Sequence, residues 1–190
     1  MCDVTAIRPL DFDQLDPELR AAVRPRYERL GYLGDFFRHL AHQPRALVAF
    51  DALTEACKVA LGPAHAETIA LTVASRLENA YELHQHERLA VRAGLGRPWV
   101  ADVERLEPDD ATTLLDDAQR AVQRFAMSAT ESHSTTSAAQ LDDVVRVTDE
   151  ARAVAVALLT GRFVAHGVIS RALDLRPAVP SIFEDGFDGR

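Results

Sequence analysis

The sequence is poor in cysteine, with only Cys2 and Cys57 among its 190 residues, and the two lie far apart in the chain. Two isolated cysteines form neither a disulfide framework nor a metal-binding motif, both of which need characteristic spacings. Thiol redox chemistry through a Cys-x-x-Cys pair is therefore excluded. Cys57 falls within a helical pattern, where a lone cysteine usually behaves as a small hydrophobic core residue.

Positive charge is also in short supply, since 21 Lys and Arg residues face 29 Asp and Glu residues and leave a net charge of -8. Nucleic acids and anionic membranes both bind basic patches, so neither is expected as a partner. No apolar run approaches the roughly 20 residues that span a bilayer, and the N-terminus lacks the apolar core of a secretory signal. We therefore expect a cytoplasmic protein.

Patterns typical of β-strands are missing, because the runs rich in Val and Leu all follow a helical period. The sequence therefore predicts an all-α protein, and its length suits one domain over residues 1–190. Residues 1–16 are expected to be extended, 128–138 a mobile surface loop, and 181–190 a tail that is frayed or docked on a neighbour. Helices are predicted at 17–30, 36–40, 44–61, 63–93, 99–106, 111–127, 140–147 and 151–175.

The stretch from Glu67 to His86 contains no Gly or Pro and gathers carboxylates and histidines at its far end. Glu82 and His86 are four residues apart, so on a helix their side chains share one face and can touch. Glu78 and Glu82 have the same spacing. Polar groups this dense inside an otherwise apolar helix need either water or a functional site.

Two interpretations of this stretch remain open, one long helix or two helices that meet near Asn79. We favour the break, because Asn is a good N-cap and Glu82 would then be the third helical residue of a capping-box variant. In a purely structural interpretation, Glu82 is only that capping residue, and its pair with His86 is an exposed contact that contributes about 0.3–0.5 kcal/mol.

Residues 36–95, and more loosely the chain on to residue 175, resemble the carboxymuconolactone decarboxylase and alkylhydroperoxidase D-like family. In the peroxidase branch a helix begins with Glu, and a Cys-x-x-Cys pair follows, with a His four positions after the second Cys. Here Glu67 matches the first Glu, Asn79 and Glu82 occupy the two cysteine positions, and His86 matches the histidine. The turn at Ala93-Gly94-Leu95 also resembles the family's Ala-Gly-Leu.

The missing cysteines decide which branch is resembled. Thiol-dependent peroxide reduction needs a thiolate and a resolving thiol, so it cannot run at this site. Glu at the second position with His four residues later resembles the decarboxylase branch, although the usual Glu-Trp is Glu82-Leu83 here. The resemblance implies an orthogonal helical bundle of the alkylhydroperoxidase D-like type. It also implies assembly into trimers or hexamers, with pockets near the subunit boundaries.

From the resemblance and the residues together we predict a cofactor-free lyase that acts on a small carboxylate or lactone by general acid–base catalysis. His86 would deliver the proton, because the pKa of an unperturbed imidazole, about 6.5, lies near working pH. Glu82 would hold one tautomer of His86, or would shuttle the proton if burial raises its pKa. Glu67 would orient the imidazole from the other side. No cofactor is expected.

Two alternatives remain. An isomerase or cyclase of a biosynthetic pathway would use the same residues, and a non-catalytic oligomeric binding or scaffold protein would keep the fold and need none of them. Asn79, Tyr81 and Arg76 are the candidate substrate-binding residues, Arg76 as a carboxylate anchor, although Tyr81 also suits the core and Arg76 the surface.

Metal binding is disfavoured, because His84 and His86 are two residues apart and a zinc-binding pair on a helix needs a spacing of four. His84 is expected to be structural or solvent-facing, and His133 to be solvated in its loop. His166, on the most apolar helix, is either a hydrogen-bonded core residue or part of the same cavity.

Overall fold

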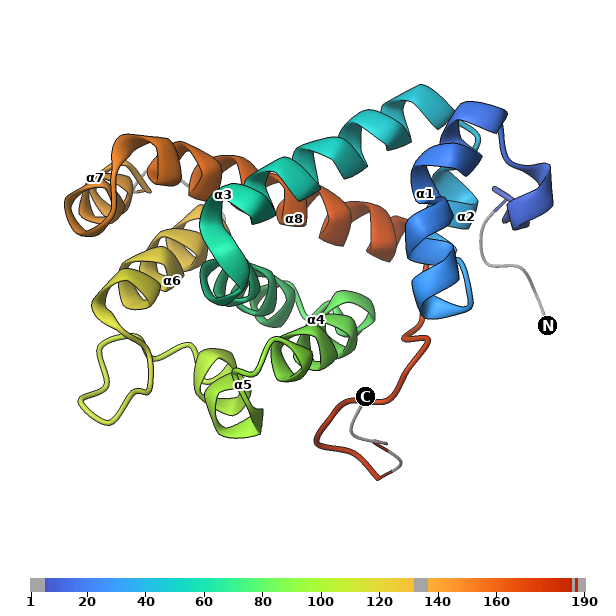
Figure 1. Cartoon of the computed structure of the whole chain (residues 1–190). Coiled ribbons are helices and arrows are strands. Elements are labelled where there is room, and N and C mark those ends of the chain that lie inside the picture. The colour runs from blue at the N-terminus through green and yellow to red at the C-terminus, as the bar shows by residue number, and fades with distance from the viewer. Residues whose placement is uncertain (1–5, 132–136, 186, 188–190) are drawn as a thin grey trace.

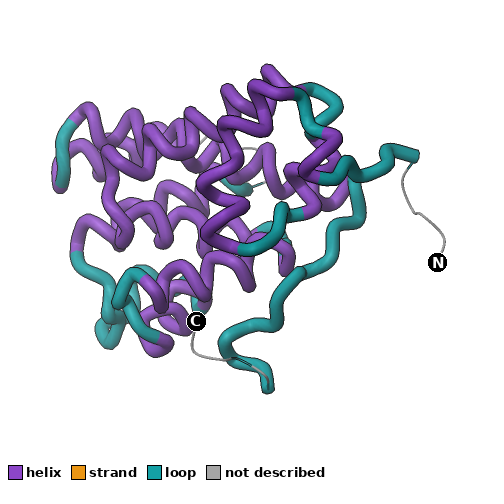
Figure 2. Tube along the Cα trace, turned by 45° about the vertical axis from the view of Figure 1, so that its right-hand side comes forward, coloured by secondary structure: helices purple, strands orange, loops and turns teal. Residues whose placement is uncertain are grey.

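The computed structural model describes residues 6–131, 137–185 and 187, and the regular structure among them is entirely helical (Figures 1 and 2). The all-α prediction is therefore confirmed. A short 3-10 helix (Phe12–Gln14) precedes eight α-helices in this part of the chain. These are α1 (Pro17–Leu30), α2 (Asp35–Leu40), α3 (Pro44–Arg76), α4 (Ala80–Arg92), α5 (Arg97–Glu104), α6 (Asp117–Ala129), α7 (Ser137–Val147) and α8 (Glu150–Ala172).

Helix α3 consists of two helical segments that meet at a kink at Gly62, where the sequence predicted that one helix ends and the next begins. Gly62 has φ 73° and ψ 170°, a conformation open almost only to glycine. Pro63 then occupies the first position of the second half, where its missing N–H costs nothing. The bend gives the two halves of α3 different directions, as the teal ribbon of Figure 1 shows.

The break near Asn79 is confirmed, because α3 ends at Arg76 and α4 begins at Ala80. The capping role expected for Glu82 is wrong, since neither Asn79 nor Glu82 makes a side-chain capping bond. Glu78 lies in the connecting turn, exposed and with φ 51°, so it does not share a helical face with Glu82. The carboxylate of Glu82 is therefore available for contacts other than a helix cap.

Helix α6 starts six residues later than the sequence predicted, at Asp117. Asp116 accepts a hydrogen bond from the Gln119 amide and forms a capping box with that residue. The preceding backbone is held out of the helix by the buried carboxylate of Asp102, which accepts hydrogen bonds from Leu114 N (2.6 Å) and Thr113 Oγ1 (2.7 Å). Of the loop predicted at 128–138, residues 132–136 lie outside the described part.

The main core lies where α8 packs along α3, with α6 and α7 covering one end. A second cluster joins α1 and α2 to the first half of α3, and a third joins α4 and α5 to the end of the chain. Glu82 and His86 lie where the first two clusters meet, since Phe163 belongs to one and Phe36 to the other.

Helix α8 is long and apolar enough to cross a membrane by length and composition, contrary to the expectation from the sequence. Half of its most apolar stretch is buried inside the molecule, where Leu159 and Phe163 join the main core. It also carries the buried polar residues Arg162 and His166. These properties are those of a central core helix.

The C-terminal segment docks on its own chain, and the prediction of a frayed or neighbour-bound tail is wrong for its described residues. The buried carboxylate of Glu87 accepts hydrogen bonds from Ser181 Oγ and Ile182 N, both at 2.7 Å. Ile182 is fully buried. His84 Nδ1 lies 3.1 Å from the Val179 carbonyl oxygen, which gives His84 a structural contact as expected.

Candidate functional site

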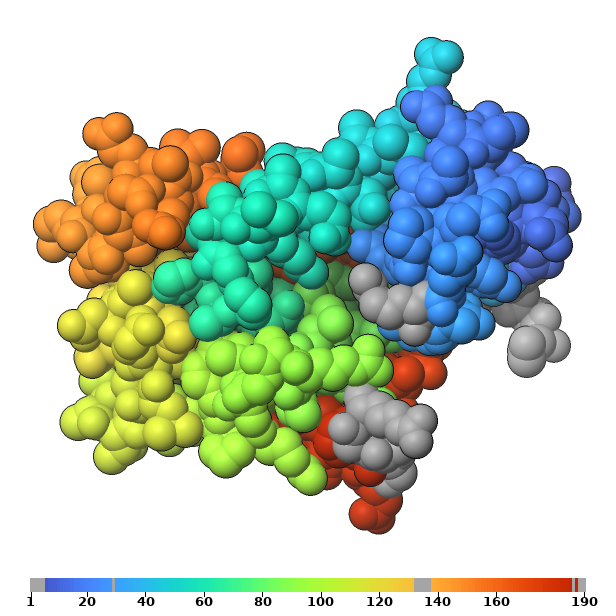
Figure 3. Space-filling view, viewed as in Figure 1, coloured from blue at the N-terminus to red at the C-terminus, as the bar shows by residue number. Residues whose placement is uncertain are grey.

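A cavity of about 410 Å³ opens between α1, α2, the first half of α3, α4 and α8. In Figure 3 the surface is hollowed between the blue α1, the teal α3 and the green α4. Glu82, His86, Arg162 and His166 all reach its lining. The volume lies in the range usual for small-molecule sites.

Glu82 lies at the centre of the polar groups of this cavity. Its Oε1 atom is 3.2 Å from His166 Nε2, and its Oε2 atom is 3.4 Å from an Arg162 guanidinium nitrogen and 3.7 Å from His86 Nε2. All four residues are buried. The carboxylate of Glu82 therefore links His86 of α4 to Arg162 and His166 of α8.

His86 is held from behind by Glu67. The distance from His86 Nδ1 to Glu67 Oε2 is 2.6 Å, that of a short charge-assisted hydrogen bond. Glu67 comes from the second half of α3 and does not reach the cavity lining. The imidazole also meets the ring of Phe163 edge to face at 5.0 Å. These contacts fix the plane of the ring and present its Nε2 atom to Glu82.

His166 is a neutral imidazole that lies beside the Glu82 carboxylate. Burial lowers the pKa of His166, against the opposing attraction of Glu82. Its Nδ1 atom lies within hydrogen-bond distance of Ser170 Oγ, at 3.0 Å. The ring of Phe36 stacks on the imidazole at 3.7 Å and further excludes water.

Glu82 and His86 form an ion pair. Burial alone would raise the pKa of Glu82, but His166, His86 and Arg162 outweigh it and hold that pKa well below the usual range. Because His166 resists protonation, the charge that keeps Glu82 ionised comes from Arg162 and His86. Burial alone would lower the pKa of His86, but Glu67 and Glu82 outweigh it and raise that pKa. The two carboxylates therefore favour the protonated form of His86.

Arg162 is held in place by a hydrogen bond and by two aromatic rings. Its Nε donates to Thr54 Oγ1 at 2.8 Å, and the guanidinium lies over the rings of Phe50 (4.7 Å) and Phe163 (4.5 Å). A guanidinium held between aromatic rings and hydrogen bonds keeps its charge in a buried place.

The structure brings the three predicted catalytic residues together and divides the three predicted substrate-binding ones. Glu67, Glu82 and His86 converge. Tyr81 lines the cavity, but its hydroxyl accepts a hydrogen bond from Phe36 N (3.0 Å), and its pKa is raised, chiefly by burial.

A substrate in this cavity would not contact Asn79 or Arg76. Asn79 lies in the turn before α4, on the side of Glu82 away from the cavity lining. Arg76 is exposed at the end of α3 and outside the lining. The prediction of these two as substrate contacts is therefore not supported by their positions.

Sequence reasoning missed Arg162 and Thr54, and it left His166 undecided. Arg162 and His166 are four residues apart in the most apolar helix, the same spacing that identified Glu82 and His86. Two such pairs on facing helices are the signal that would have found the whole cluster.

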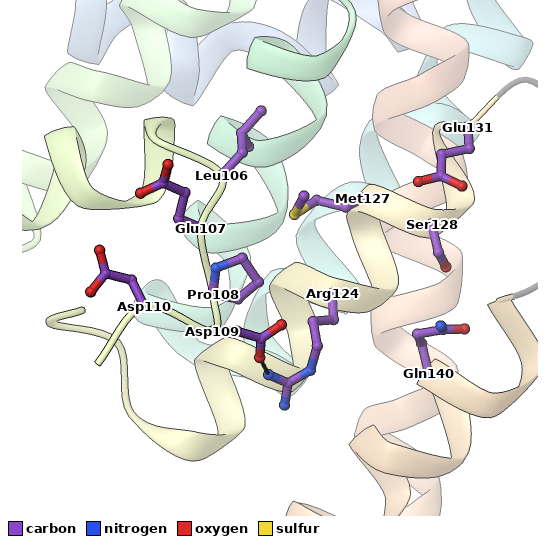
Figure 4. A pocket seen from close by; sticks show the side chains of 10 residues that line it. All are labelled: Leu106, Glu107, Pro108, Asp109, Asp110, Arg124, Met127, Ser128, Glu131 and Gln140. Carbon is purple, nitrogen blue, oxygen red and sulfur yellow. Dashed lines mark hydrogen bonds and ion pairs between the residues drawn. The ribbon is translucent and has the colours of Figure 1, made fainter. Parts of the chain in front are cut away.

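A second hollow, of about 610 Å³, lies between the α5–α6 connection and α6 (Figure 4). It is larger but wide open, and the described residues of its lining include neither histidine nor cysteine. The ion pair of Arg124 with Asp109 (2.7 Å) bridges its wall. Without a buried acid–base pair, it is the weaker candidate despite its size.

Comparisons with known proteins bear on the fold. No protein-family model and no curated protein sequence matches the chain. The debrominase Bmp8 superposes with a TM-score of 0.76 at 20% identity, over 91% of this chain and 92% of that one. A cysteine-to-alanine variant of Bmp8 in complex with 2,3,4-tribromopyrrole gives 0.75 at 20%, over 90% and 91%.

Two uncharacterised peroxidase-related proteins are also similar. The one from Ralstonia eutropha JMP134, an alkylhydroperoxidase AhpD core, has a TM-score of 0.75 at 19% identity over 90% of this chain and 91% of its own. The one from Silicibacter sp. TM1040 has 0.72 at 20%, over 93% and 95%. The chain therefore has the alkylhydroperoxidase D-like fold that the resemblance predicted.

Proposed function

We propose that the protein is a cofactor-free lyase of the carboxymuconolactone decarboxylase type, acting on a small carboxylate or lactone by general acid–base catalysis. The observation that carries this proposal is the buried Glu67–His86–Glu82 chain at the end of a small-molecule cavity. The presence of an enzyme, the debrominase, among proteins of this fold supports a catalytic role.

In such a reaction the bond between the carboxylate and its carbon breaks and carbon dioxide leaves. The electron pair flows into a conjugated carbonyl of the substrate, and the resulting enolate then takes a proton on carbon. His86, as an imidazolium facing the cavity, would deliver that proton. Glu67 would act as a positioning residue, since it holds the ring through Nδ1 and does not reach the cavity.

The role that we propose for Glu82 differs from the proton shuttle that the sequence analysis considered. A carboxylate with a lowered pKa is a poor proton acceptor, so Glu82 would hold His86 charged and oriented. Arg162 would stabilise a developing oxyanion of the substrate, because its charged guanidinium is buried beside the cavity. Neither assignment needs a metal or an organic cofactor.

The experiment is a turnover assay on a panel of unsaturated lactone carboxylates, following carbon dioxide release and, by NMR, isomerisation or cyclisation without it. His86→Gln should lower kcat by about 10²–10⁴, the usual contribution of a general acid. His84→Gln is the matched control, because His84 is on the same helix and does not line the cavity. Its kcat should stay near that of the wild type.

Each alternative gives a different result. Conversion without carbon dioxide release that still requires His86 would identify an isomerase or cyclase. A panel that binds in the cavity but is never converted would favour a binding protein. Equal activity of His86→Gln and the wild type would overturn the assignment of His86.

A further inference from the structure

The side chains that line the cavity carry more positive than negative charge, whereas the protein as a whole is negatively charged. The chain has a net charge of -8, yet among the described residues that line this cavity five are Lys or Arg and two are Glu. The cations are Arg26, Lys58, Arg88, Arg92 and Arg162, and the carboxylates are Glu55 and Glu82. A positive cavity in an acidic protein concentrates small anions.

Three of the five cationic side chains already form ion pairs or hydrogen bonds with other groups of the protein. Arg26 forms an ion pair with Asp51 at 2.7 Å, and Arg162 forms one with Glu82 at 3.4 Å. Arg88 Nε donates to a carbonyl oxygen of the tail at 3.3 Å. These contacts hold the three side chains in the cavity walls.

Lys58 and Arg92 are different. Neither has a hydrogen bond or an ion pair with any residue that the structure describes. Lys58 is the single lysine of the sequence and is half-buried on the first half of α3, while Arg92, the last residue of α4, is exposed. A half-buried cation has given up part of its hydration, and an anion that reaches it restores the lost interaction.

We propose that Lys58 and Arg92 together form an anion-binding subsite, which holds a carboxylate of the substrate while its reacting carbon faces His86. The inference rests on the proposed function in taking this cavity as the substrate site. The aromatic side chains of Tyr32, Phe36 and Phe37 also line the cavity. The expected ligand is therefore a small, flat, unsaturated acid with one retained carboxylate.

The test compares benzoate with its uncharged analogue benzamide by isothermal titration calorimetry on the full chain. Benzoate should bind more tightly, and its advantage should shrink at high salt. In the Lys58→Gln/Arg92→Gln double variant, benzoate should bind about tenfold more weakly, as expected for the loss of charge-assisted bonds. The affinity for benzamide should not change.

Two controls and two outcomes complete this test. Arg76→Gln and Arg45→Gln remove exposed cations outside the cavity and should leave benzoate binding unchanged. Equal loss in the controls, no preference for benzoate, or no binding of either probe would overturn the subsite. That result is separable from the proposed function, because His86→Gln removes turnover without touching Lys58 or Arg92.

A second inference comes from the outer face of α8, where a stripe of apolar and small residues is open to solvent. Val154, Leu158 and Val168 are 57%, 48% and 63% exposed. The stripe, hereafter the α8 stripe, consists of Ala151, Val154, Leu158, Gly161, Ala165, Val168 and Ala172. Its spacing alternates between three and four residues throughout, the pattern of a helix that packs on another helix.

The charges at the ends of α8 select one partner and one direction. Asp149 and Glu150 begin the helix, and Arg171 stands in its last turn. Two copies packed antiparallel, with Gly161 at the two-fold axis, would place Glu150 of one beside Arg171 of the other. The same arrangement sets Val154 against Val168. The face is thus complementary to itself in both charge and shape.

The geometry points to a second copy of this chain as the occupant of the α8 stripe, in an antiparallel two-fold pair. Gly161 provides the sharpest variant, because a Cβ built there meets nothing within 4 Å in the same chain. Gly161→Leu should leave the fold intact and yet block the close approach. Sedimentation should show the wild-type association through this face weakened at least tenfold in the variant. Val59→Arg, at a residue 84% exposed on α3, is the control.

Charge reversal tests the direction. Glu150→Arg and Arg171→Glu should each weaken association, and the two together should restore it if the helices are antiparallel. A monomeric wild type, or unchanged association in Gly161→Leu, would overturn the pairing. Binding of the wild type to neutral phosphatidylcholine vesicles, lost in Leu158→Arg, would instead identify the stripe as a membrane-contacting face.

Discussion

Helix α4 carries two buried carboxylates, Glu82 and Glu87, that face different parts of the molecule and have different partners. Glu82 faces the cavity and is surrounded by Arg162 and two imidazoles. Glu87 faces the tail and accepts hydrogen bonds from uncharged donors, a hydroxyl and a backbone amide. Both are buried to a similar degree.

The difference shows that burial alone does not mark a functional carboxylate. Cations around Glu82 keep it ionised, and Glu82 together with Glu67 raises the pKa of His86 beside the cavity. The neutral donors around Glu87 fasten the end of the chain. On that side burial, with a smaller contribution from Glu87, raises the pKa of Glu104 to about 7. The charged partners and the adjoining space distinguish the site.

The largest effect is expected at Glu82. Glu82→Gln should lower the free energy of unfolding by about 3–5 kcal/mol, because Arg162 and His86 would keep their charges in a buried place without a counter-charge. Urea denaturation measures the change. Glu78→Gln, at an exposed residue four positions earlier, should stay within about 0.5 kcal/mol of the wild type.

A double variant sharpens that test. Glu82→Leu with Arg162→Met removes both charges together, and it should be more stable than Glu82→Leu alone. Additive losses would mean that the two side chains are not coupled, and the ionic account of the cluster would fail.

A smaller and more local effect is expected at Glu87. Glu87→Met keeps the volume and removes the acceptor, so Ser181 Oγ and Ile182 N would lose their hydrogen bonds at a cost of about 1–3 kcal/mol. Hydrogen exchange should become faster at Ile182 before it does so in α8. Unchanged protection at Ile182 would show that the tail is held by its apolar contacts instead.

The imidazole gives a third comparison, through pH. The raised pKa of His86 means that its ion pairs contribute stability that is fully present below the unfolded pKa of about 6.5 and is lost as pH rises through the folded pKa. Glu67→Gln should move that loss to lower pH, because the carboxylate that raises the pKa is gone. The pH dependence of the melting temperature, compared between variant and wild type, measures the shift. Superimposable profiles would contradict the assignment.

The smallest effect is expected at Glu104. Its folded pKa of about 7 lies above the unfolded value, so the wild type loses stability as pH rises from roughly 4.5 to 7. Glu104→Gln mimics the neutral form and should match the wild type near pH 5 and melt higher above about pH 8. An equal gain at both pH values would mean that the charge of Glu104 is not responsible.

How far the sequence predicted the site depends on whether a contact is local. The pairing of Glu82 with His86 follows from helical spacing, whereas the break at Asn79 was predicted from a capping box whose side-chain bond the structure does not contain. The family resemblance singled out Glu67, and the structure places its carboxylate against the imidazole, while its role in catalysis stays a prediction.

Contacts between distant segments were beyond this reasoning. Arg162 and Thr54 meet across 108 positions, and only the packing of α8 on α3 creates that contact. The start of α6 was misplaced because the buried carboxylate of Asp102 holds the preceding backbone in another conformation. Arg76 was assigned to the site by proximity in sequence, but it precedes a turn that sends α4 in a new direction.

The bend at Gly62 separates two kinds of residue on one helix. Lys58 precedes it on the cavity wall, and Glu67 follows it behind the imidazole. A change in the bend would therefore alter the distance between the wall and the proton donor while every side chain of the site stayed the same. A substitution at Gly62 would therefore change the length of ligand that fits between Lys58 and His86 without changing either residue.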